Sequence, residues 1–154
     1  MEKILLFDPD KCCGCRTCEL VCSFSNEGVI NPYLSRIKRI TLADDLCFVP
    51  MTCLQCEEPY CLEACPAGAI SKGEDGVVRI DQQRCVGCKM CLLACPFGNI
   101  AVRERSFKCE HCDGDPRCVK SCSNKALAYV KKGEAGYEKL NRTARKLQEI
   151  GKTG

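Results

Sequence analysis

CVGCKMCLLACP, residues 85–96, contains four cysteines at the spacing C-x2-C-x2-C-x3-C and ends on a proline. The run CCGCRTCELVC at 12–22 repeats this spacing, and two further runs keep it with a wider middle gap. That gap is four residues in CLQCEEPYCLEACP at 53–66 and five in CEHCDGDPRCVKSC at 109–122. Four quartets thus take up most of the 18 cysteines of the 154-residue chain. Their members are Cys12, Cys15, Cys18, Cys22, Cys53, Cys56, Cys61, Cys65, Cys85, Cys88, Cys91, Cys95, Cys109, Cys112, Cys118 and Cys122.

The spacing suits ligands that wrap a bulky metal cluster. A [4Fe–4S] cluster needs one thiolate on each iron, and three thiols at two-residue gaps can reach three corners of one cube. Gly14 and Gly87 lie inside such loops, where a missing Cβ permits positive φ angles and close approach. The fourth cysteine is expected at the start of a short helix, pointing away from its own loop toward another cluster.

Two other uses of dense cysteines fit the sequence less well. Structural zinc requires two C-x2-C pairs separated by a longer loop, and three closely spaced cysteines crowd one small ion. Disulfides require an oxidising compartment, but the apolar run Ile4–Phe7 is too short for the core of a signal peptide. No apolar run approaches the ~20 residues of a membrane span. We therefore expect a cytoplasmic metal-binding protein without a membrane span.

The formal net charge of +3 treats every cysteine as a neutral thiol. Sixteen thiolates and four oxidised clusters with cores of charge +2 would change this total to about −5. The basic residues are therefore interpreted as compensation for buried anionic clusters. They include Arg36, Lys38, Arg39, Arg103 and Arg105. Aromatic residues do not interleave with them as a nucleic-acid surface would require, so no nucleic-acid partner is expected.

Short strand patterns lie outside the quartets. The expected strands cover residues 4–7, 36–42, 47–49, 69–71, 77–80 and 126–130. A turn containing Gly73 and Gly76 joins 69–71 to 77–80 in a hairpin that brings the second and third quartets together. The strand at 126–130 can pair with the strand at 4–7, which would bring the first and fourth quartets together.

The quartets and their flanks resemble those of the four-cluster ferredoxin-like electron-transfer subunits. The resemblance rests on DPDKCCGCRTCELVCS, CLQCEEPYCLEACPAGAI, CVGCKMCLLACPFG and the terminal CEHC and CVKSC, and it covers residues 1 to about 130. Such subunits accompany molybdenum and tungsten oxidoreductases of the dimethyl sulfoxide reductase type, formate-linked hydrogenases and carbon monoxide dehydrogenase. The short form, with SRIKRI at 35–40, looks most like the small subunit of tungsten aldehyde oxidoreductases.

The resemblance implies four [4Fe–4S] clusters with ligands exchanged between quartets, and we name the four ligand sets as sites. Site I comprises Cys12, Cys15, Cys18 and Cys122. Site II comprises Cys22, Cys109, Cys112 and Cys118. Site III comprises Cys53, Cys56, Cys61 and Cys95. Site IV comprises Cys65, Cys85, Cys88 and Cys91. Ser23 and Ser123 depart from the pattern, because many relatives have proline after the fourth cysteine.

The predicted fold is α+β, with two pseudo-symmetric ferredoxin-like units of short hairpins and short helices organised by the clusters. The cluster domain covers 1–130, with an inner unit at about 50–100 and an outer unit formed by 1–49 and 101–130. The tail, 131–154, is predicted to form an amphipathic C-terminal helix. Its apolar positions are Tyr137, Leu140, Ala144, Leu147 and Ile150.

Three residues remain outside the pattern. Cys13 and Cys47 are expected to be small buried thiols, with redox sensing as the alternative. His111 is expected at the surface or behind the ligands of the fourth quartet, because four cysteines already suffice to bind a cluster.

The predicted function is electron transfer without substrate chemistry, because no nucleophile–base pair, phosphate loop or open metal coordination position is visible. Catalysis would lie with a larger oxidoreductase subunit, preferably a tungsten or molybdenum aldehyde oxidoreductase, and a further donor or acceptor subunit is possible. The alternatives are a free polyferredoxin shuttle, or a subunit of a hydrogenase, formate dehydrogenase or carbon monoxide dehydrogenase.

Overall fold

The structure is a computed structural model that describes residues 2–42 and 47–134. The strands are β1 (Lys3–Phe7), β2 (Ile37–Leu42), β3 (Cys47–Thr52), β4 (Ile70–Lys72), β5 (Val78–Ile80), β6 (Ala101–Val102), β7 (Ser106–Phe107) and β8 (Leu127–Lys131). The α-helices are α1 (Thr17–Glu27), α2 (Tyr60–Glu63), α3 (Met90–Ala94) and α4 (Arg117–Lys120). The 3-10 turns are η1 (Pro9–Lys11), η2 (Pro32–Leu34) and η4 (His111–Gly114).

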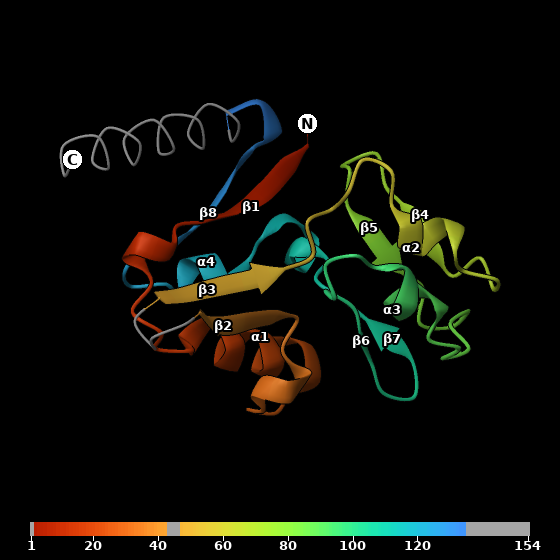
Figure 1. The fold of residues 1–154 in the computed structure, drawn as a ribbon, viewed down its shortest axis with the longest axis horizontal. Helices are drawn as coiled ribbons and strands as arrows, with labels where there is room; N and C mark the ends of the chain where they lie inside the picture. Colours follow the sequence, from red (N-terminus) through yellow and green to blue (C-terminus); the bar gives the residue numbers. More distant parts are fainter. Residues whose placement is uncertain (1, 43–46, 135–154) are drawn as a thin grey trace.

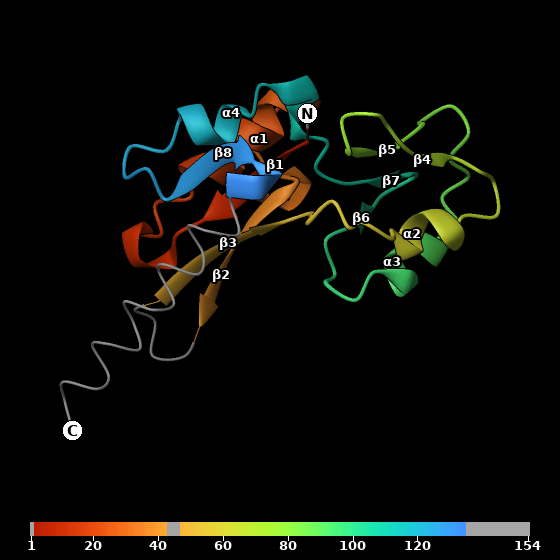
Figure 2. The ribbon, with the colours of Figure 1, turned by 90° about the horizontal axis from the view of Figure 1, so that it is seen from above.

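The elements form two groups, which lie side by side (Figures 1 and 2). One group contains β1, β8, β2, β3, α1 and α4, and the other contains α2, α3 and the strands β4 to β7. Each group has its own small core, built around Leu5, Ile37 and Leu127 in the first and around Ile70 and Val78 in the second. Cysteines are part of both cores. The mixed α+β class is confirmed, whereas the pseudo-symmetry and the unit boundaries stay predictions.

All strands pair in two-stranded antiparallel sheets, in the order β1-β8, β2-β3, β4-β5 and β6-β7. The predicted pairing of the segment at 4–7 with that at 126–130 is confirmed, with Leu5 opposite Tyr129. The amide of Asp8 also donates to the carbonyl of Ala126 at 2.8 Å. This pairing places the loop of the first quartet beside the end of the fourth, and α1 packs against α4.

The helices differ from the prediction, which placed the fourth cysteine of a quartet at a helix start. Helix α3 contains Cys91 and ends before Cys95, whose backbone is extended at φ −80° and ψ 109°. Pro96 explains this end, because a proline disfavours the α conformation of the residue before it. Ser23 stands at the corresponding place after Cys22, and α1 continues to Glu27 and ends at Gly28 with φ 71°.

The amphipathic tail predicted over 131–154 lies outside the described residues from residue 135 onward. Strand β8 occupies the chain up to Lys131. No helix in the described ranges is long and apolar enough to cross a membrane.

Candidate metal centres

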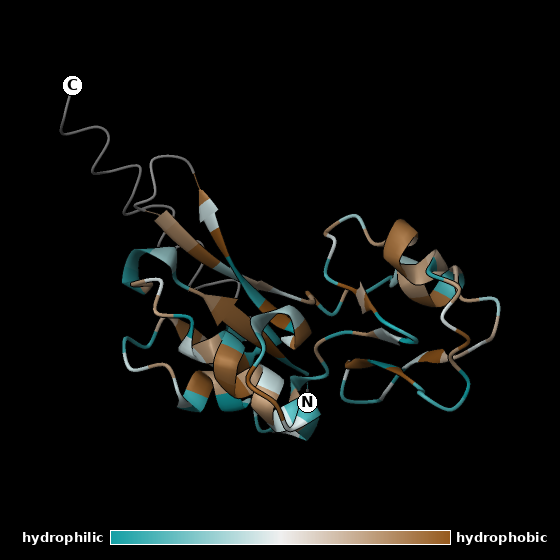
Figure 3. Ribbon diagram, turned by 90° about the horizontal axis from the view of Figure 1, so that it is seen from below, coloured by the Kyte–Doolittle hydropathy of each residue, from teal (hydrophilic) through white to brown (hydrophobic). Residues whose placement is uncertain are grey.

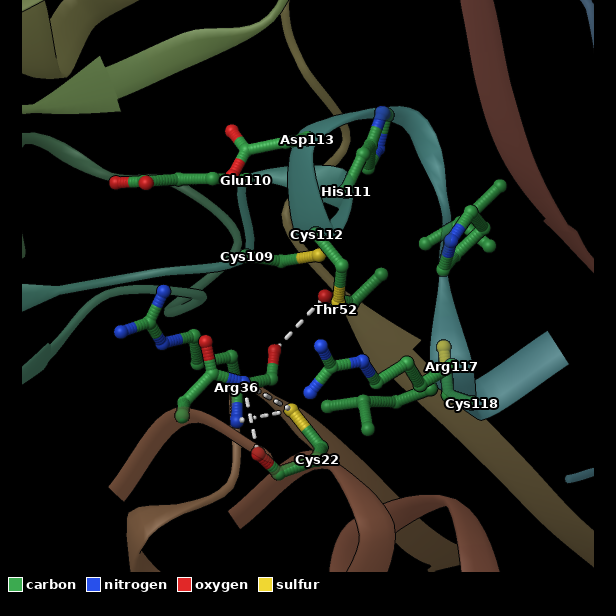
Figure 4. A pocket seen from close by; sticks show the side chains of 14 residues that line it. Cys22, Arg36, Thr52, Cys109, Glu110, His111, Cys112, Asp113, Arg117 and Cys118 are labelled. Atoms are coloured by element: carbon green, nitrogen blue, oxygen red, sulfur yellow. Dashed lines mark hydrogen bonds between the residues drawn. The ribbon is translucent and has the colours of Figure 1, made fainter. Parts of the chain in front are cut away.

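Site II lines a cavity of about 70 Å³ in the first group of elements. Helix α1 supplies Cys22 from one side, and the segment 109–118 supplies the other cysteines from the opposite side (Figure 4). The backbone amide of Arg36 donates to Cys22 Sγ at 3.3 Å, and Asn26 Nδ2 lies 3.6 Å from the same sulfur. The structure thus brings together three cysteines of the fourth quartet and the last cysteine of the first.

Sites I and IV each line a further cavity. The cavity of site I, about 20 Å³, is lined by the first three ligands of the first quartet and by Cys122 of the fourth. The cavity of site IV, about 10 Å³, is lined by the first three ligands of the third quartet and by Cys65 of the second. In both places the cysteine that completes the set comes from another quartet.

Site III is recognised from the electrostatic neighbours of its thiols. Burial raises the pKa of Cys56 and of Cys61, and the charges of Cys53 and Cys95 raise both further. Cys95 belongs to the third quartet, whereas the other three thiols belong to the second. The four thiols of site III are therefore close enough to influence one another's ionisation.

The four loops share one backbone feature, a positive φ at the residue before the second cysteine. These residues are Gly14 (φ 72°), Gln55 (φ 49°), Gly87 (φ 70°) and His111 (φ 57°). A Cβ at Gly87 would lie 2.1 Å from the carbonyl oxygen of Glu104, so only glycine fits there. Gln55 and His111 adopt the same conformation with buried side chains, which the sequence did not indicate.

Backbone amides also point at ligand sulfurs in sites I and IV. The amide of Ala69 donates to Cys65 Sγ and that of Ala126 to Cys122 Sγ, both at 3.3 Å. Ser106 in β7 contacts two candidate ligands of site IV. Its amide donates to Cys85 Sγ at 3.4 Å, and its Oγ lies 3.2 Å from Cys91 Sγ. Such donors stabilise thiolate charge and tune the potential of a bound cluster.

Several candidate ligands are buried deeply enough to resist ionisation as free thiols. Burial raises the pKa of Cys18 to about 12 and that of Cys109 to about 11, and it raises the pKa of Cys118 strongly as well. A thiolate at these positions needs a nearby positive charge, which iron supplies when a cluster binds. The thiol-only donor sets and the amides aimed at sulfur therefore fit [4Fe–4S] clusters. Among the described residues, no three His, Cys, Asp or Glu side chains are arranged to hold a single metal ion.

The residues outside the quartets differ partly from the prediction. Cys13 and Cys47 are exposed, so the expectation of buried thiols was wrong at both positions. Cys13 lies in the loop of site I and lines the cavity of that site, and Cys47 occupies the first position of β3. His111 is buried, lines the cavity of site II and packs edge-on against Tyr129, with ring centroids 5.2 Å apart. Burial lowers its pKa to about 4, so the imidazole is neutral near pH 7.

A family profile described as a 4Fe-4S dicluster domain matches residues 44–113. The chain is 38% identical over 142 residues to the putative electron transport protein YsaA of Escherichia coli, covering 82% of this chain and 88% of that protein. It is also 38% identical over 144 residues to the polyferredoxin-like subunit of aliphatic sulfonate oxidoreductase from Pyrococcus furiosus. That match covers 90% of this chain and 82% of the subunit. The chain belongs to the polyferredoxin-like family of iron–sulfur electron-transport proteins.

Membership of this family confirms the predicted class of protein, a non-catalytic [4Fe–4S] electron carrier. A further relative, the electron transport protein HydN of Escherichia coli, is 30% identical to this chain. The match covers 94% of this chain and 98% of the length of HydN. Among solved structures, a chain of the active-site complex BamBC of benzoyl coenzyme A reductase is 28% identical to this chain. The match covers 83% of this chain and 75% of that chain. The TM-score of that match is 0.45, too low to support a functional conclusion.

Proposed function

We propose that the chain holds four [4Fe–4S] clusters in sites I to IV and relays single electrons along them between two docked redox partners. The observation that carries this proposal is the lining of three separate cavities, each by one ligand set that combines two quartets. When bound, each cluster supplies one-electron redox chemistry without bond making or proton transfer. The chain's own residues hold the clusters and fix their order.

The order I–II–III–IV follows from the connections between the loops. Sites I and II exchange ligands between the first and fourth quartets, and sites III and IV between the second and third. The two pairs meet at Gln55, which precedes the site III ligand Cys56. Its Nε2 donates to the carbonyl oxygen of the site II ligand Cys109 at 2.9 Å. This hydrogen bond supports sites II and III as the neighbours at the centre of the relay.

The exposed ends of the relay would be sites I and IV, because Cys15 and Cys88 are exposed ligands of these sites. Around site IV the surface is apolar: Val86 is 70% exposed and Leu93 in α3 is 79% exposed. Figure 3 shows α3 as hydrophobic along its length. Desolvating such a surface favours a docked protein partner. This supports a bound subunit over a freely diffusing carrier, which needs only one accessible centre.

The proposed partner is the larger catalytic subunit of a cytoplasmic oxidoreductase, with a tungsten or molybdenum enzyme favoured. Two observations support it: the resemblance of the short form to subunits of tungsten enzymes, and a relative named as a subunit of an aliphatic sulfonate oxidoreductase. The test is anaerobic purification of the tagged chain from its native host. We expect one large subunit to co-elute in constant ratio, with tungsten or molybdenum detected by metal analysis. A monomer that reduces several unrelated enzymes equally well would support the shuttle instead.

The crossed ligation predicts which pairs of cysteine substitutions act on one cluster. Cys22→Ala combined with Cys118→Ala removes two ligands of site II, so about twelve irons should remain. Cys22→Ala combined with Cys18→Ala damages sites I and II, so only about eight should remain. Iron analysis after anaerobic reconstitution distinguishes the two double variants. The reverse pattern would mean that each quartet binds its own cluster, and the crossed assignment would be rejected.

A further inference from the structure

Lys108 is a buried cation without a carboxylate partner among the described residues. Its side chain is 1% exposed, and it lies directly before Cys109, the first ligand of the fourth quartet. Its Nζ donates to the carbonyl oxygens of Cys109 (3.0 Å) and Val78 and to Gln55 Oε1 (3.4 Å). All three acceptors are neutral, and they match the three donors of an ammonium group. A lysine is almost never fully buried unless an opposite charge compensates it.

Lys108 lies beside the loop of site III: its Nζ donates to Oε1 of Gln55 at 3.4 Å, and Gln55 directly precedes the site III ligand Cys56. In agreement with this position, burial raises the pKa of the Cys56 and Cys61 thiols, and the charge of Lys108 opposes that rise at both sulfurs. The ammonium group therefore lies where it stabilises negative charge on the ligands of site III. No carboxylate in residues 2–42 or 47–134 forms an ion pair with it, so its field is not cancelled locally.

Lys108 also lies at the junction between the two groups of elements. Val78 belongs to β5 and Gln55 to the site III loop, whereas Lys108 leads into the segment that supplies three ligands of site II. Gln55 accepts from Lys108 and from the amide of Val78 (2.9 Å) and donates to Cys109, so one side chain joins both groups to the cation. The charge is thus fixed at the point where an electron crosses between sites II and III.

We propose that Lys108 is the fixed charge that raises the reduction potential of the cluster in site III and so allows electron transfer between sites II and III. The inference rests on the ligand assignment proposed above. Reduction of site III adds one electron from a neighbouring reduced cluster and takes up no proton, so the added negative charge must be stabilised by the surroundings. Lys108 supplies a buried positive charge that needs no reorganisation when the electron arrives.

Replacing the charge should change the redox equilibrium of site III selectively. For Lys108→Met we expect the equilibrium constant of one-electron reduction at site III to fall about tenfold or more, equivalent to about 59 mV per tenfold. Lys108→Arg keeps a cation and should stay within about threefold of the unmodified chain. The measurement is an anaerobic redox titration of the loaded protein followed by electron paramagnetic resonance. The signal of site III is identified by its loss in Cys95→Ala.

Lys11 offers a matched control. It precedes Cys12, the first ligand of the first quartet, as Lys108 precedes Cys109. Its side chain is 58% exposed and pairs with Asp8 at 3.5 Å. Lys11→Met should therefore leave all potentials nearly unchanged, because solvent and the carboxylate screen the charge.

A second variant tests the charge without removing the lysine. Gln55→Glu places a carboxylate beside Nζ and should lower the potential of site III in the same direction as Lys108→Met. Loss of site III iron in Lys108→Met but not in Lys108→Arg would also support a requirement for charge. Equal iron loss in both variants would show a packing role and overturn the inference.

Unchanged potentials in Lys108→Met and Gln55→Glu, with full iron content, would overturn the inference while leaving the relay intact. A deficit of iron in the unmodified chain would instead refute the ligand assignment itself, so the two failures are distinguishable.

Discussion

The chain stripped of iron is expected to show no cooperative thermal unfolding transition. Ordering a residue costs about 1–2 kcal/mol of backbone entropy, and apolar burial must offset this cost. The structure divides its apolar interior into two small cores, and the larger one includes the buried cysteines Cys22, Cys109 and Cys118. These thiols contribute little until iron links them, so the free energy of cluster binding is also free energy of folding.

The test compares the loaded chain with the chain after anaerobic chelation, both with excess reductant so that no disulfide forms. Differential scanning calorimetry should show a transition only for the loaded chain, and reconstitution with iron and sulfide should restore it. A single cooperative transition of the iron-free chain, together with a well-dispersed NMR spectrum, would contradict the role assigned to the clusters in folding.

Gly87→Ala should remove the site IV cluster and leave the other three in place. The added Cβ would lie 2.1 Å from the carbonyl oxygen of Glu104, a backbone atom that cannot rotate away. Relieving this contact must move the loop that carries Cys85 and Cys88, both ligands of site IV. We therefore expect about twelve irons instead of about sixteen, because one [4Fe–4S] cluster is lost.

Gly98→Ala is the matched control for this prediction. Gly98 has nearly the same backbone conformation, φ 63° against 70° at Gly87, but nothing lies within 4 Å of its Cβ position. Both substitutions carry the cost of about 1–2 kcal/mol for a left-handed alanine, and only Gly87→Ala adds the contact with Glu104. Equal iron loss in the two variants would mean that backbone strain, and not the contact, explains the effect.

The parts of the fold predicted from sequence are those with a local and repeated signal. The strand pairs β1-β8 and β4-β5 were expected from short strand patterns and a turn, and the structure contains both. The segments of β2 and β3 were also expected as strands, but their pairing was not predicted. The cysteine spacing also indicated that each fourth cysteine serves a neighbouring loop. The structure gathers three of these sets, sites I, II and IV, around common cavities, although ligation itself stays a prediction.

The parts that sequence did not reveal depend on tertiary contacts. Strands β6 and β7 have two residues each and give no pattern, yet β7 places Ser106 against two sulfurs of site IV. The burial of Lys108 is equally unexpected, because lysine is almost never fully buried. Its hydrogen-bond acceptors come from residues 55, 78 and 109, which meet only after both groups of elements have formed.

The central claim is that sixteen cysteines hold four [4Fe–4S] clusters. Iron and acid-labile sulfide, measured per chain on protein purified and reconstituted without oxygen, test it most directly. The account predicts about sixteen of each in a brown protein without stoichiometric zinc. Eight or fewer irons per chain after careful reconstitution would contradict it.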